Sequence, residues 1–446
     1  MNTDNQQLDK PQTLRGFSDW FAPDVRQRQF VINTFVKTFE KYGYEPLETP
    51  ALEYSQFMLG ISGEEAEKQF YRFKDQGGRD VMLKYEVMTA MCRAVAANFD
   101  KVVFPYKRYQ IQPVWRAENT QKGRYRQFTQ CDADTIGSPS MLVDAEFIQM
   151  GLEITSRLGF KKFFAKVSNR KFLEGLAKYF QIPDSQFYGL CMSLDKLVKI
   201  GSKAVIDELV EKRGLDLTTA QKILDLINPD KFSALSNDKI LAAFQSNIGQ
   251  TEIGRQALDE LSQIFEFLAV SSVDPQLYRF DPSLARGLAS YTGPVWEFEV
   301  IDGGVGSIAG CGRYDNVIGR YLKTDKLIPA TGGSFGIERI CDIIKGQNLF
   351  SPPPSPTKAL VTIFSEEFLA ESLKIANALR SSGIPVLLYP DSEKLSKQFK
   401  YADAKQIPYA LVIGPDEKAK NVITIKSLES QTQQSLPLDQ IITMLK

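Results

Sequence analysis

Toward its C-terminal end the chain alternates short apolar runs with segments of helical periodicity. Three runs have the length of buried strands: Ala359–Phe364, Val386–Tyr389 and Tyr409–Ile413. The two intervening segments, Glu366–Ser382 and Lys394–Lys405, place apolar residues on one helical face. Because strands that alternate with helices form parallel sheets, the pattern predicts a small α/β domain with a largely parallel sheet over residues 357–446.

A proline-rich segment precedes this predicted domain. Residues 351–356, Ser-Pro-Pro-Pro-Ser-Pro, contain four prolines. Since proline fits neither a helix interior nor a central strand, we expect a stiff linker at 351–356.

In the rest of the chain, strand-like segments lie on both sides of a helical region. The strand-like segments are Val102–Tyr106, Tyr109–Trp115, Arg126–Asp132, Val295–Val300 and Ser307–Ala309. Helical spacing occurs in Lys203–Arg213 and Thr218–Ile227 between them, and in Arg26–Tyr42 before them. We therefore expect an α+β fold, with a core formed by residues 1–170 and 269–350 and a helical insertion at 171–268.

The composition is that of a globular protein rather than a fibrous, disordered or membrane-spanning one. Of the 446 residues, 43% are apolar and 24% are charged, and no apolar run approaches the roughly 20 residues of a membrane helix. The 54 Lys and Arg residues balance 54 Asp and Glu residues, which argues against a general polycation for nucleic-acid backbones. The polar start, Met1–Lys10, has no apolar signal core, and we expect a cytoplasmic protein.

The cysteine and histidine content of the chain excludes several catalytic mechanisms and metal sites. The five cysteines are scattered and form no Cys-x-x-Cys pair, which predicts reduced thiols rather than a disulfide framework. The chain contains no histidine. An imidazole base, a His metal ligand and a Ser-His triad are therefore excluded, and no zinc site is expected. Any catalysis must use Arg, Lys, carboxylates, amides, Tyr or the backbone.

Residues 115–128 run from the end of one predicted strand, through a glycine-containing loop rich in Arg and Lys, into the next predicted strand. Arg116 and Arg124 on its two sides are suited to clamp a polyphosphate, because guanidinium groups make bidentate contacts to phosphate. Glu118, among these cations, is suited to accept a hydrogen bond from an exocyclic amine. A solvated basic hairpin without a ligand is the alternative.

Three further stretches combine glycine with a charged residue. Arg286, in the mostly apolar stretch Leu284–Gly293, needs a permanent anionic partner, either a bound phosphate or carboxylate or a structural acidic residue. The glycines of Ala309–Asp315 let the backbone approach a ligand or form a β-bulge. Those of Gly332–Arg339 enter a helical segment, where they seat an anion or permit close packing.

Together these stretches resemble the histidyl-tRNA synthetases, a family of class II aminoacyl-tRNA synthetases. Six segments carry the resemblance: the opening segment with motif 1 (Arg15–Glu53), motif 2 (Trp115–Asp134), two signatures of the histidine-specific family (Arg286–Gly293 and Ala309–Asp315), motif 3 (Gly332–Arg339) and part of the anticodon-binding domain (Leu395–Asp403). The resemblance implies a class II core on a mainly antiparallel sheet, a C-terminal α/β anticodon-binding domain, and a homodimer formed through motif 1.

The resemblance also implies a reaction and residue roles. Histidine and ATP, with Mg²⁺, would give histidyl-adenylate, and the histidyl group would pass to the 3′ end of tRNA(His). Arg116 and Arg286 would be catalytic, because they would stabilise charge on the α-phosphate. The implied binding residues are Arg116, Glu118, Arg124 and Arg339 for ATP; Glu86, Gln130, Asp134, Arg286, Tyr291, Gly310 and Tyr314 for histidine; and Gln121 and Arg126 for the tRNA acceptor end.

Several positions depart from the family pattern. Met88 stands where Thr is common and Ala289-Ser290 where a pair such as Asp-Tyr is usual, while Cys311 replaces Gly and Thr129 replaces His. The first two departures concern the amino-acid pocket. Two other functions therefore stay open: a catalytically inactive paralogue acting as the regulatory subunit of a histidine-biosynthesis phosphoribosyltransferase, and a synthetase-like enzyme for another small polar amino acid.

Overall fold

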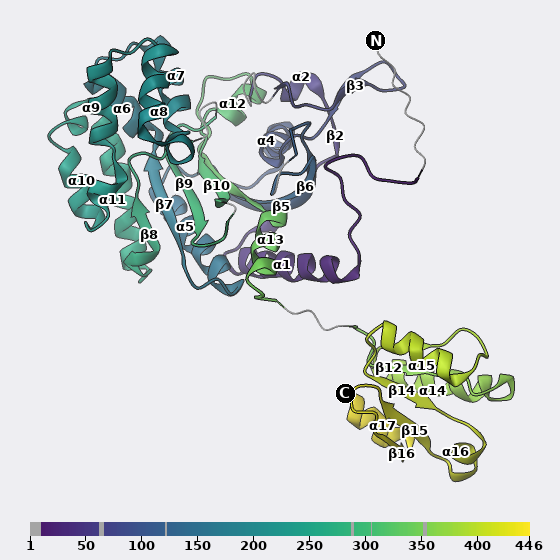
Figure 1. Cartoon of the computed structure of the whole chain (residues 1–446). Helices are drawn as coiled ribbons and strands as arrows, with labels where there is room; N and C mark the ends of the chain where they lie inside the picture. Colours follow the sequence, from purple (N-terminus) through teal and green to yellow (C-terminus); the bar gives the residue numbers. More distant parts are fainter. Residues whose placement is uncertain (1–9, 62–66, 121–122, 287–289, 305, 351–354) are drawn as a thin grey trace. The chain divides into compact units, whose positions relative to one another are not determined.

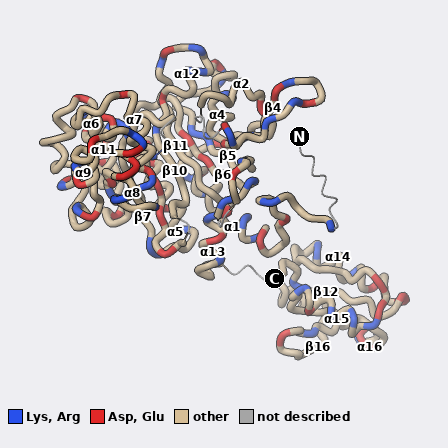
Figure 2. The backbone as a smooth tube through the Cα atoms, turned by 45° about the horizontal axis from the view of Figure 1, so that its top comes forward, with Lys and Arg blue, Asp and Glu red and all other residues tan. Residues whose placement is uncertain are grey.

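The computed structural model describes residues 10–61, 67–120, 123–286, 290–304, 306–350 and 355–446. The chain folds as two compact units, residues 1–350 and residues 351–446 (Figure 1). Basic and acidic residues are interspersed along both units (Figure 2). Within the described ranges, no helix is long and apolar enough to cross a membrane.

An eight-stranded sheet forms the centre of the first unit. In spatial order its strands are β1 (Glu45–Pro46), β5 (Tyr106–Trp115), β6 (Gln127–Ile136), β11 (Ala330–Gly336), β10 (Ser307–Arg313), β9 (Pro294–Val300), β7 (Phe163–Asn169) and β8 (Tyr278–Phe280). All neighbouring pairs from β5 to β7 are antiparallel, whereas the outer pairs β1–β5 and β7–β8 are parallel. The expected α+β fold on a mainly antiparallel sheet is confirmed.

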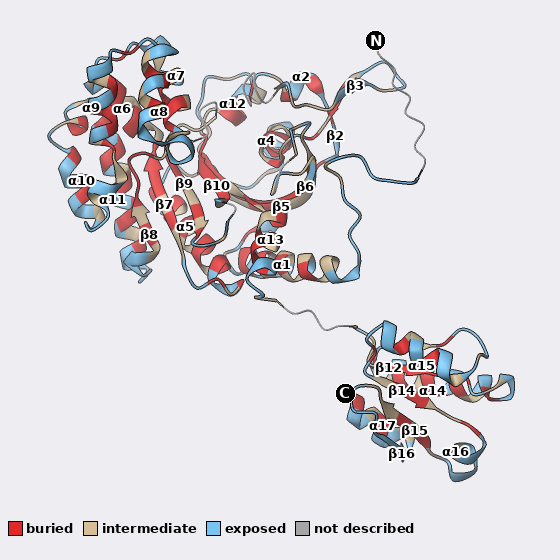
Figure 3. Ribbon diagram, in the orientation of Figure 1, coloured by how far each residue is buried: buried red, intermediate tan, exposed pale blue. Residues whose placement is uncertain are grey.

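Three helices cover one face of this sheet: α1 (Ala22–Lys41), α5 (Met141–Arg157) and α13 (Ile337–Gly346) (Figure 1). Buried aromatic rings join the layers. The ring of Phe35 in α1 lies 4.9 Å from that of Phe335 in β11, and Phe147 of α5 lies 5.6 Å from Trp296 of β9. The strands and the inner sides of these helices are buried (Figure 3). Burial of each such ring contributes roughly 1.5–3 kcal/mol, so this face is the core and the other face is available for polar groups.

A buried ion pair fastens α5 to the middle of the sheet. Arg313 at the end of β10 pairs with Asp144 of α5, and the Thr331 hydroxyl of β11 donates a 2.6 Å hydrogen bond to the same carboxylate. All three side chains are buried. Because a buried charge without its partners is costly, this network fixes the position of α5 on the sheet.

Thr331→Val is expected to lower the free energy of unfolding by about 1.5–3 kcal/mol, because it removes a hydrogen bond to a buried carboxylate. Guanidinium unfolding followed by tryptophan fluorescence reports on the first unit alone, since Trp20, Trp115 and Trp296 all lie in it. The matched control is Thr218→Val, at an exposed helical position, which should change stability by less than about 0.5 kcal/mol. Equal stability of the two variants would contradict the prediction.

Helices fill the chain between β7 and β8: α6 (Arg170–Tyr179), α7 (Asp184–Leu194), α8 (Leu197–Glu211), α9 (Leu217–Leu226), α10 (Asn237–Phe244) and α11 (Glu252–Val270). They form a bundle beside the sheet (Figure 1). The ring of Phe172 in α6 lies edge-on to Phe244 of α10 at 4.9 Å and to Phe280 of β8 at 5.2 Å. These contacts join the bundle to the edge strand of the sheet.

A smaller layer lies near β5 and β6. Its described residues form a three-stranded antiparallel sheet, β2 (Leu52–Tyr54), β4 (Asp80–Leu83) and β3 (Arg72–Lys74), together with the helices α2 (Ser55–Met58), α4 (Val87–Ala97) and α12 (Val317–Leu322). Helix α4 packs against β5 and β6. Glu86, at the N-cap position of α4, is thereby brought close to the sheet.

The second unit contains a five-stranded sheet with helices. Its elements are β13 (Val386–Leu388), β12 (Ala359–Val361), β14 (Tyr409–Val412), β15 (Ile423–Ser427) and β16 (Gln433–Leu436), in spatial order, with α14 (Leu369–Ser381), α15 (Leu395–Ala404), α16 (Pro415–Lys420) and α17 (Leu438–Leu445). Strands β13, β12 and β14 are parallel, as predicted, but β15 and β16 add two antiparallel strands. The sheet is therefore mixed rather than largely parallel.

One strand prediction in the first unit is wrong. The apolar run at Val102–Tyr106 suggested a strand, but β5 begins only at Tyr106 and residues 102–105 lie outside any strand. Pro105 has no N–H to donate to a neighbouring strand, which explains why the ladder starts after it.

Candidate active site

A cavity of about 430 Å³ lies on the face of the sheet opposite the core helices. The predicted site residues that line it are Glu86, Arg116, Glu118, Arg124, Gln130, Asp134, Arg286, Tyr291, Gly310, Tyr314 and Arg339. Arg126 is not among its lining residues, and Gln121 lies outside the described residues. Segments far apart in the sequence therefore form one site.

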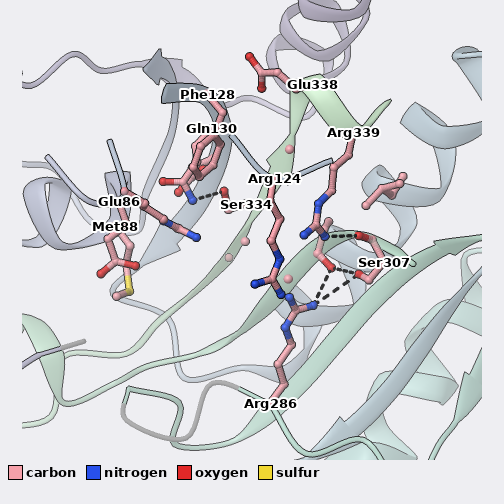
Figure 4. A pocket seen from close by; sticks show the side chains of 18 of the residues that line it. Glu86, Met88, Arg124, Phe128, Gln130, Arg286, Ser307, Ser334, Glu338 and Arg339 are labelled. Atoms are coloured by element: carbon pink, nitrogen blue, oxygen red, sulfur yellow. Dashed lines mark hydrogen bonds between the residues drawn. The ribbon is translucent and has the colours of Figure 1, made fainter. Parts of the chain in front are cut away.

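Guanidinium groups from four stretches of the chain meet at this cavity. Burial lowers the pKa of Arg339, and the charges of Arg286, Arg124 and Arg116 lower it further. Figure 4 shows the side chains of Arg124, Arg286 and Arg339 close together. Because like charges repel in a partly desolvated site, this arrangement is suited to bind a polyanion such as a nucleotide polyphosphate.

Arg116 is held by aromatic rings. Its guanidinium carbon lies 4.5 Å from the ring centroid of Tyr85 and 4.9 Å from that of Phe128, and its Nε donates to the Tyr85 carbonyl at 3.2 Å. Glu118 lies 3.8 Å from Arg116 and 3.5 Å from Arg124. Stacking and these ion pairs fix the orientation of the Arg116 fork before any ligand binds.

Arg286 is held across β10 by a carboxylate of β9. Its Nη1 pairs with Glu297 and donates to the Ala309 carbonyl at 3.2 Å and to Ser307 Oγ at 3.4 Å. Gly310 leaves space for this side chain, because a Cβ at position 310 would lie only 2.8 Å from the guanidinium carbon of Arg286. The side chain is still 33% exposed and lines the cavity. Arg286 therefore has a structural partner and also a surface for an anionic ligand.

The first turn of α13 joins several elements around the cavity. Arg339 donates to the Ser307 carbonyl at 3.0 Å. The neighbouring Glu338 pairs with Arg28 of α1 at 2.5 Å and accepts from the backbone N–H of Thr129 at 3.0 Å. Thr129 Oγ1 in turn accepts from Arg28 at 2.8 Å. Thr129, one of the departures from the family pattern, is thus part of a satisfied polar network.

The other side of the cavity is acidic and amide-rich. Glu86 and Met88 lie away from Arg286 and Arg339 in Figure 4. Gln130 of β6 is fixed at both ends of its amide: Oε1 accepts from the Val87 N–H at 3.1 Å, and Nε2 donates to Ser334 Oγ at 2.7 Å. The cavity is therefore polarised, with cations on one side and acceptors on the other.

Asp134 lies on the same face of β6 and has two partners. Its carboxylate pairs with Arg108, whose side chain is fully buried, and accepts from the hydroxyl of Tyr314. Burial raises the pKa of Asp134, while Arg108 and the Tyr314 hydrogen bond oppose that rise. Both carboxylate oxygens are thus engaged with protein groups.

Arg126 supports the loop from outside the cavity. Its Nε donates to the Glu118 carbonyl at 3.0 Å, and its backbone N–H donates to the Gly16 carbonyl at 2.9 Å. Gly16 has φ +89°, and a Cβ there would lie 2.7 Å from Arg126 Cγ. The segment around Gly16 therefore packs directly on the Arg-rich loop, which accounts for a glycine at this position.

Several residues at or behind the cavity were not predicted from the sequence, among them Asp132, Glu297, Ser307 and Ser334. The alternation of β6 held the signal for Asp132, because residues 130, 132 and 134 share one face of a strand. Nothing in the local pattern indicated Glu297, since its role depends on the register in which it lies opposite Gly310.

Three of the other departures also lie at the cavity. Met88 and Ser290 line it, while Ala289 lies outside the described residues. Cys311 is buried beneath the floor opposite Gly333, where a Cβ would lie 2.2 Å from the Cys311 sulfur. The thiol thus occupies the space that a side chain at 333 would need. Among the described residues, no group of three or more Cys, Asp or Glu is arranged to hold a metal ion.

An antiparallel sheet carrying this polarised, arginine-lined cavity defines a class II aminoacyl-tRNA synthetase core. The family model for histidyl-tRNA synthetase matches residues 16–340, and that for an anticodon binding domain matches residues 358–446. This chain belongs to the histidyl-tRNA synthetase family.

Individual relatives agree with this assignment. The chain is 35% identical to the histidine–tRNA ligase of Cytophaga hutchinsonii, covering 98% of this chain and 100% of that protein, and 35% identical to the one of Wolinella succinogenes, covering 95% of both. The histidyl-tRNA synthetase structure from Nostoc sp. PCC 7120 matches with a TM-score of 0.83 and 28% identity over 97% of this chain and 99% of that chain. A Bacillus halodurans structure, described as an ATP phosphoribosyltransferase regulatory subunit/histidyl-tRNA synthetase, shares the fold at TM-score 0.72 and 20% identity, covering 87% of this chain and 97% of that one.

Proposed function

We propose that this chain is a histidine–tRNA ligase, which activates histidine with ATP and transfers it to the 3′ end of tRNA(His). One observation carries the proposal: a single cavity places four arginines on one side and carboxylate and amide acceptors on the other. A zwitterionic amino acid beside a nucleotide polyphosphate matches this distribution of charge. The family relationship supplies histidine as the amino acid.

In the activation step, a carboxylate oxygen of histidine attacks the α-phosphorus of ATP. The new O–P bond forms histidyl-adenylate as the bond to the β-phosphate breaks and pyrophosphate leaves with its electron pair. Arg116 and Arg286 are positioned to stabilise the charge that builds on the α-phosphate. Arg124 and Arg339 bind the distal phosphates, and Glu118 accepts from the adenine amine. No imidazole is needed, because fixed cations and positioning lower the barrier.

The amino acid occupies the acceptor side of the cavity. The residues proposed to bind histidine are Glu86, Gln130, Asp134, Arg286, Tyr291, Gly310 and Tyr314. Burial raises the pKa of the Tyr314 hydroxyl far above its usual value, so that it stays protonated and keeps its hydrogen bond to Asp134, which orients that carboxylate.

Magnesium would enter with ATP rather than in a site built by the protein. Mg²⁺ commonly keeps water ligands and is bound through substrate phosphates and one or two carboxylates. The described residues contain no group of three or more Cys, Asp or Glu that would hold the ion without ATP. When bound, the ion would neutralise phosphate charge. No zinc is required by the proposed chemistry.

We also infer how the parts of the chain divide the work on tRNA. Residues 357–446 would bind the anticodon, after a linker at 351–356, of which residues 351–354 lie outside the described residues. The core formed by residues 1–170 and 269–350 would carry out catalysis, and the insertion at 171–268 would be a separate domain. Gln121 and Arg126, in and beside the loop, would face the acceptor end. A homodimer through the motif 1 segment and a cytoplasmic location complete the proposal.

The two alternatives make distinct demands on the site. An inactive regulatory paralogue needs no phosphate clamp, yet Arg116, Arg124, Arg286 and Arg339 all line the cavity, which favours the ligase. The Bacillus halodurans structure described as an ATP phosphoribosyltransferase regulatory subunit/histidyl-tRNA synthetase, at 20% identity, shares the fold alone. A different amino-acid substrate is favoured only by the presence of Met88 and Ser290 at the cavity.

Amino-acid-dependent exchange of pyrophosphate into ATP separates these functions. With each amino acid supplied in turn, exchange is expected with histidine alone, followed by histidine transfer to tRNA(His). Absence of exchange with every amino acid would support the regulatory paralogue. Exchange with a different amino acid would overturn the assignment of histidine.

A further inference from the structure

The carboxyl group of Asp132 lies on the cavity floor between two proposed histidine-binding residues. Asp132 follows Gln130 and precedes Asp134 on the same face of β6, and it lines the cavity. Across the sheet it lies opposite Gln110 of β5 and Ser334 of β11. The strand geometry therefore aims this carboxyl group at the ligand space.

One oxygen of this carboxyl group is left without a protein partner. Asp132 is 3% exposed, and its Oδ1 has no hydrogen-bond partner within the described part of the chain. Asp134, two residues further on, already engages Arg108 and Tyr314. A buried carboxylate oxygen without a donor is costly. Unlike Asp134, Asp132 thus has acceptor capacity left for a ligand.

The surroundings of Asp132 favour a cationic ligand. Burial raises the pKa of Asp132 to about 8. Arg108 and a hydrogen bond with Ser334 oppose this rise, whereas the charges of Asp134 and Glu86 add to it. A second positive charge at the site would offset these acidic neighbours and hold Asp132 ionised. The α-ammonium group of an amino acid is permanently charged near neutral pH and has three N–H donors, whereas the histidine imidazole is mostly neutral there.

We propose that Asp132 is a specificity-determining residue that accepts a hydrogen bond from the α-ammonium group of the amino-acid substrate. Met88, which lines the same cavity, has no polar group to offer the ammonium, whereas Asp132 supplies an acceptor. The substrate carboxylate then points toward the arginines on the opposite side, as the activation step requires. This inference rests on the proposed function.

Asp132→Asn in the full chain tests the inference. The KM for histidine in pyrophosphate exchange is expected to rise at least about 10-fold, because a charge-assisted hydrogen bond to the ammonium is weakened. The KM for ATP should change less than about two-fold. Glu299→Gln is the matched control, since Glu299 also lies on a strand of this sheet but pairs with Lys166 at 2.6 Å outside the cavity; both KM values should then match the wild type.

Two competitive inhibitors distinguish the ammonium from the imidazole. Histidinol keeps the ammonium group and should bind Asp132→Asn at least about 10-fold more weakly than the wild type. Imidazole-4-propionate lacks the ammonium group and should bind both proteins equally. Equal weakening of the two inhibitors, or an unchanged KM for histidine, would overturn the inference. Failure of the wild type to exchange pyrophosphate with histidine would instead refute the proposed function.

The melting temperature of Asp132→Asn provides a second readout. If Asp132 had only a structural role, the substitution would lower the melting temperature. In the folded chain Asp132 holds its proton up to a pH of about 8, whereas an unfolded Asp releases it near pH 4. Its contribution to stability is therefore complete below about pH 4 and is lost as the pH rises through 8. The polar and titratable groups around Asp132 are Arg108, Asp134, Ser334, Glu86, Lys84, Cys131 and Cys311.

These groups are unchanged in Asp132→Asn. The melting temperature of this variant should be no lower than that of the wild type at pH 6, and it should be higher than that of the wild type at pH 9. A lower melting temperature at both pH values would overturn the inference.

Discussion

Arg286→Ala is expected to reduce the kcat of histidine-dependent pyrophosphate exchange by about 10²–10³-fold, the usual effect of removing one preorganised group that stabilises transition-state charge. The KM for histidine should change much less, because the charge on the α-phosphate grows mainly in the transition state. Exchange kinetics at saturating ATP, with the histidine concentration varied, measure the two parameters separately. Arg286→Lys should lie between the alanine variant and the wild type, since lysine keeps the charge but not the planar fork.

Stability shows whether Arg286 is catalytic or structural. Its partner Glu297 is 19% exposed, so water can hydrate the carboxylate that Arg286→Ala leaves behind, and the melting temperature should change little. A cooperative loss of folding would contradict a catalytic role. Glu297→Gln offers a further check, because it should lower kcat through a less firmly held Arg286.

Removal of residues 351–446 is expected to leave pyrophosphate exchange within about three-fold of the full chain while reducing charging of tRNA(His) about 10²–10⁴-fold. The range follows from the loss of one of two linked contacts with the same tRNA. Unpaired anticodon bases expose their edges to side chains, and that is the recognition the second unit is proposed to supply.

The independence of the two units makes this truncation interpretable. The cluster around Val361, Leu379 and Leu411 is a hydrophobic core of the second unit, separate from the core around Phe335 in the first. Aminoacylation and exchange assays on the same truncated preparation provide the comparison. Equal losses in both assays would mean that the second unit supports the catalytic core instead of binding tRNA.

Local periodicity accounts for much of the predicted fold. Helix α1 and strands β6, β9 and β14 begin and end within a few residues of their sequence-based positions, because one buried face imposes a clear period. Strand β16, Gln433–Leu436, is polar and mostly exposed. It carries no alternation, which is why the antiparallel end of the second sheet was not predicted.

Some residues of the site could be predicted from the local sequence pattern, whereas others depend on how distant strands pair. Alternation along β6 places Gln130 and Asp134 on one face, and the same rule was sufficient to include Asp132. The convergence of Arg286 and Arg339 depends on how β10 and β11 pair, which no local pattern contains. Only the resemblance to a known family brought these residues together before the fold was seen.

Cys311 and Gly333 occupy one small volume on adjacent strands, and this limits what position 333 can hold. The thiol fits because position 333 has no side chain, so any larger residue at 333 would collide with the sulfur. Glycine at 311 would not open this space, because a Cβ at 333 would still lie 2.9 Å from the Cα of residue 311. Related sequences that keep this strand pairing should therefore retain glycine at 333, whatever residue stands at 311.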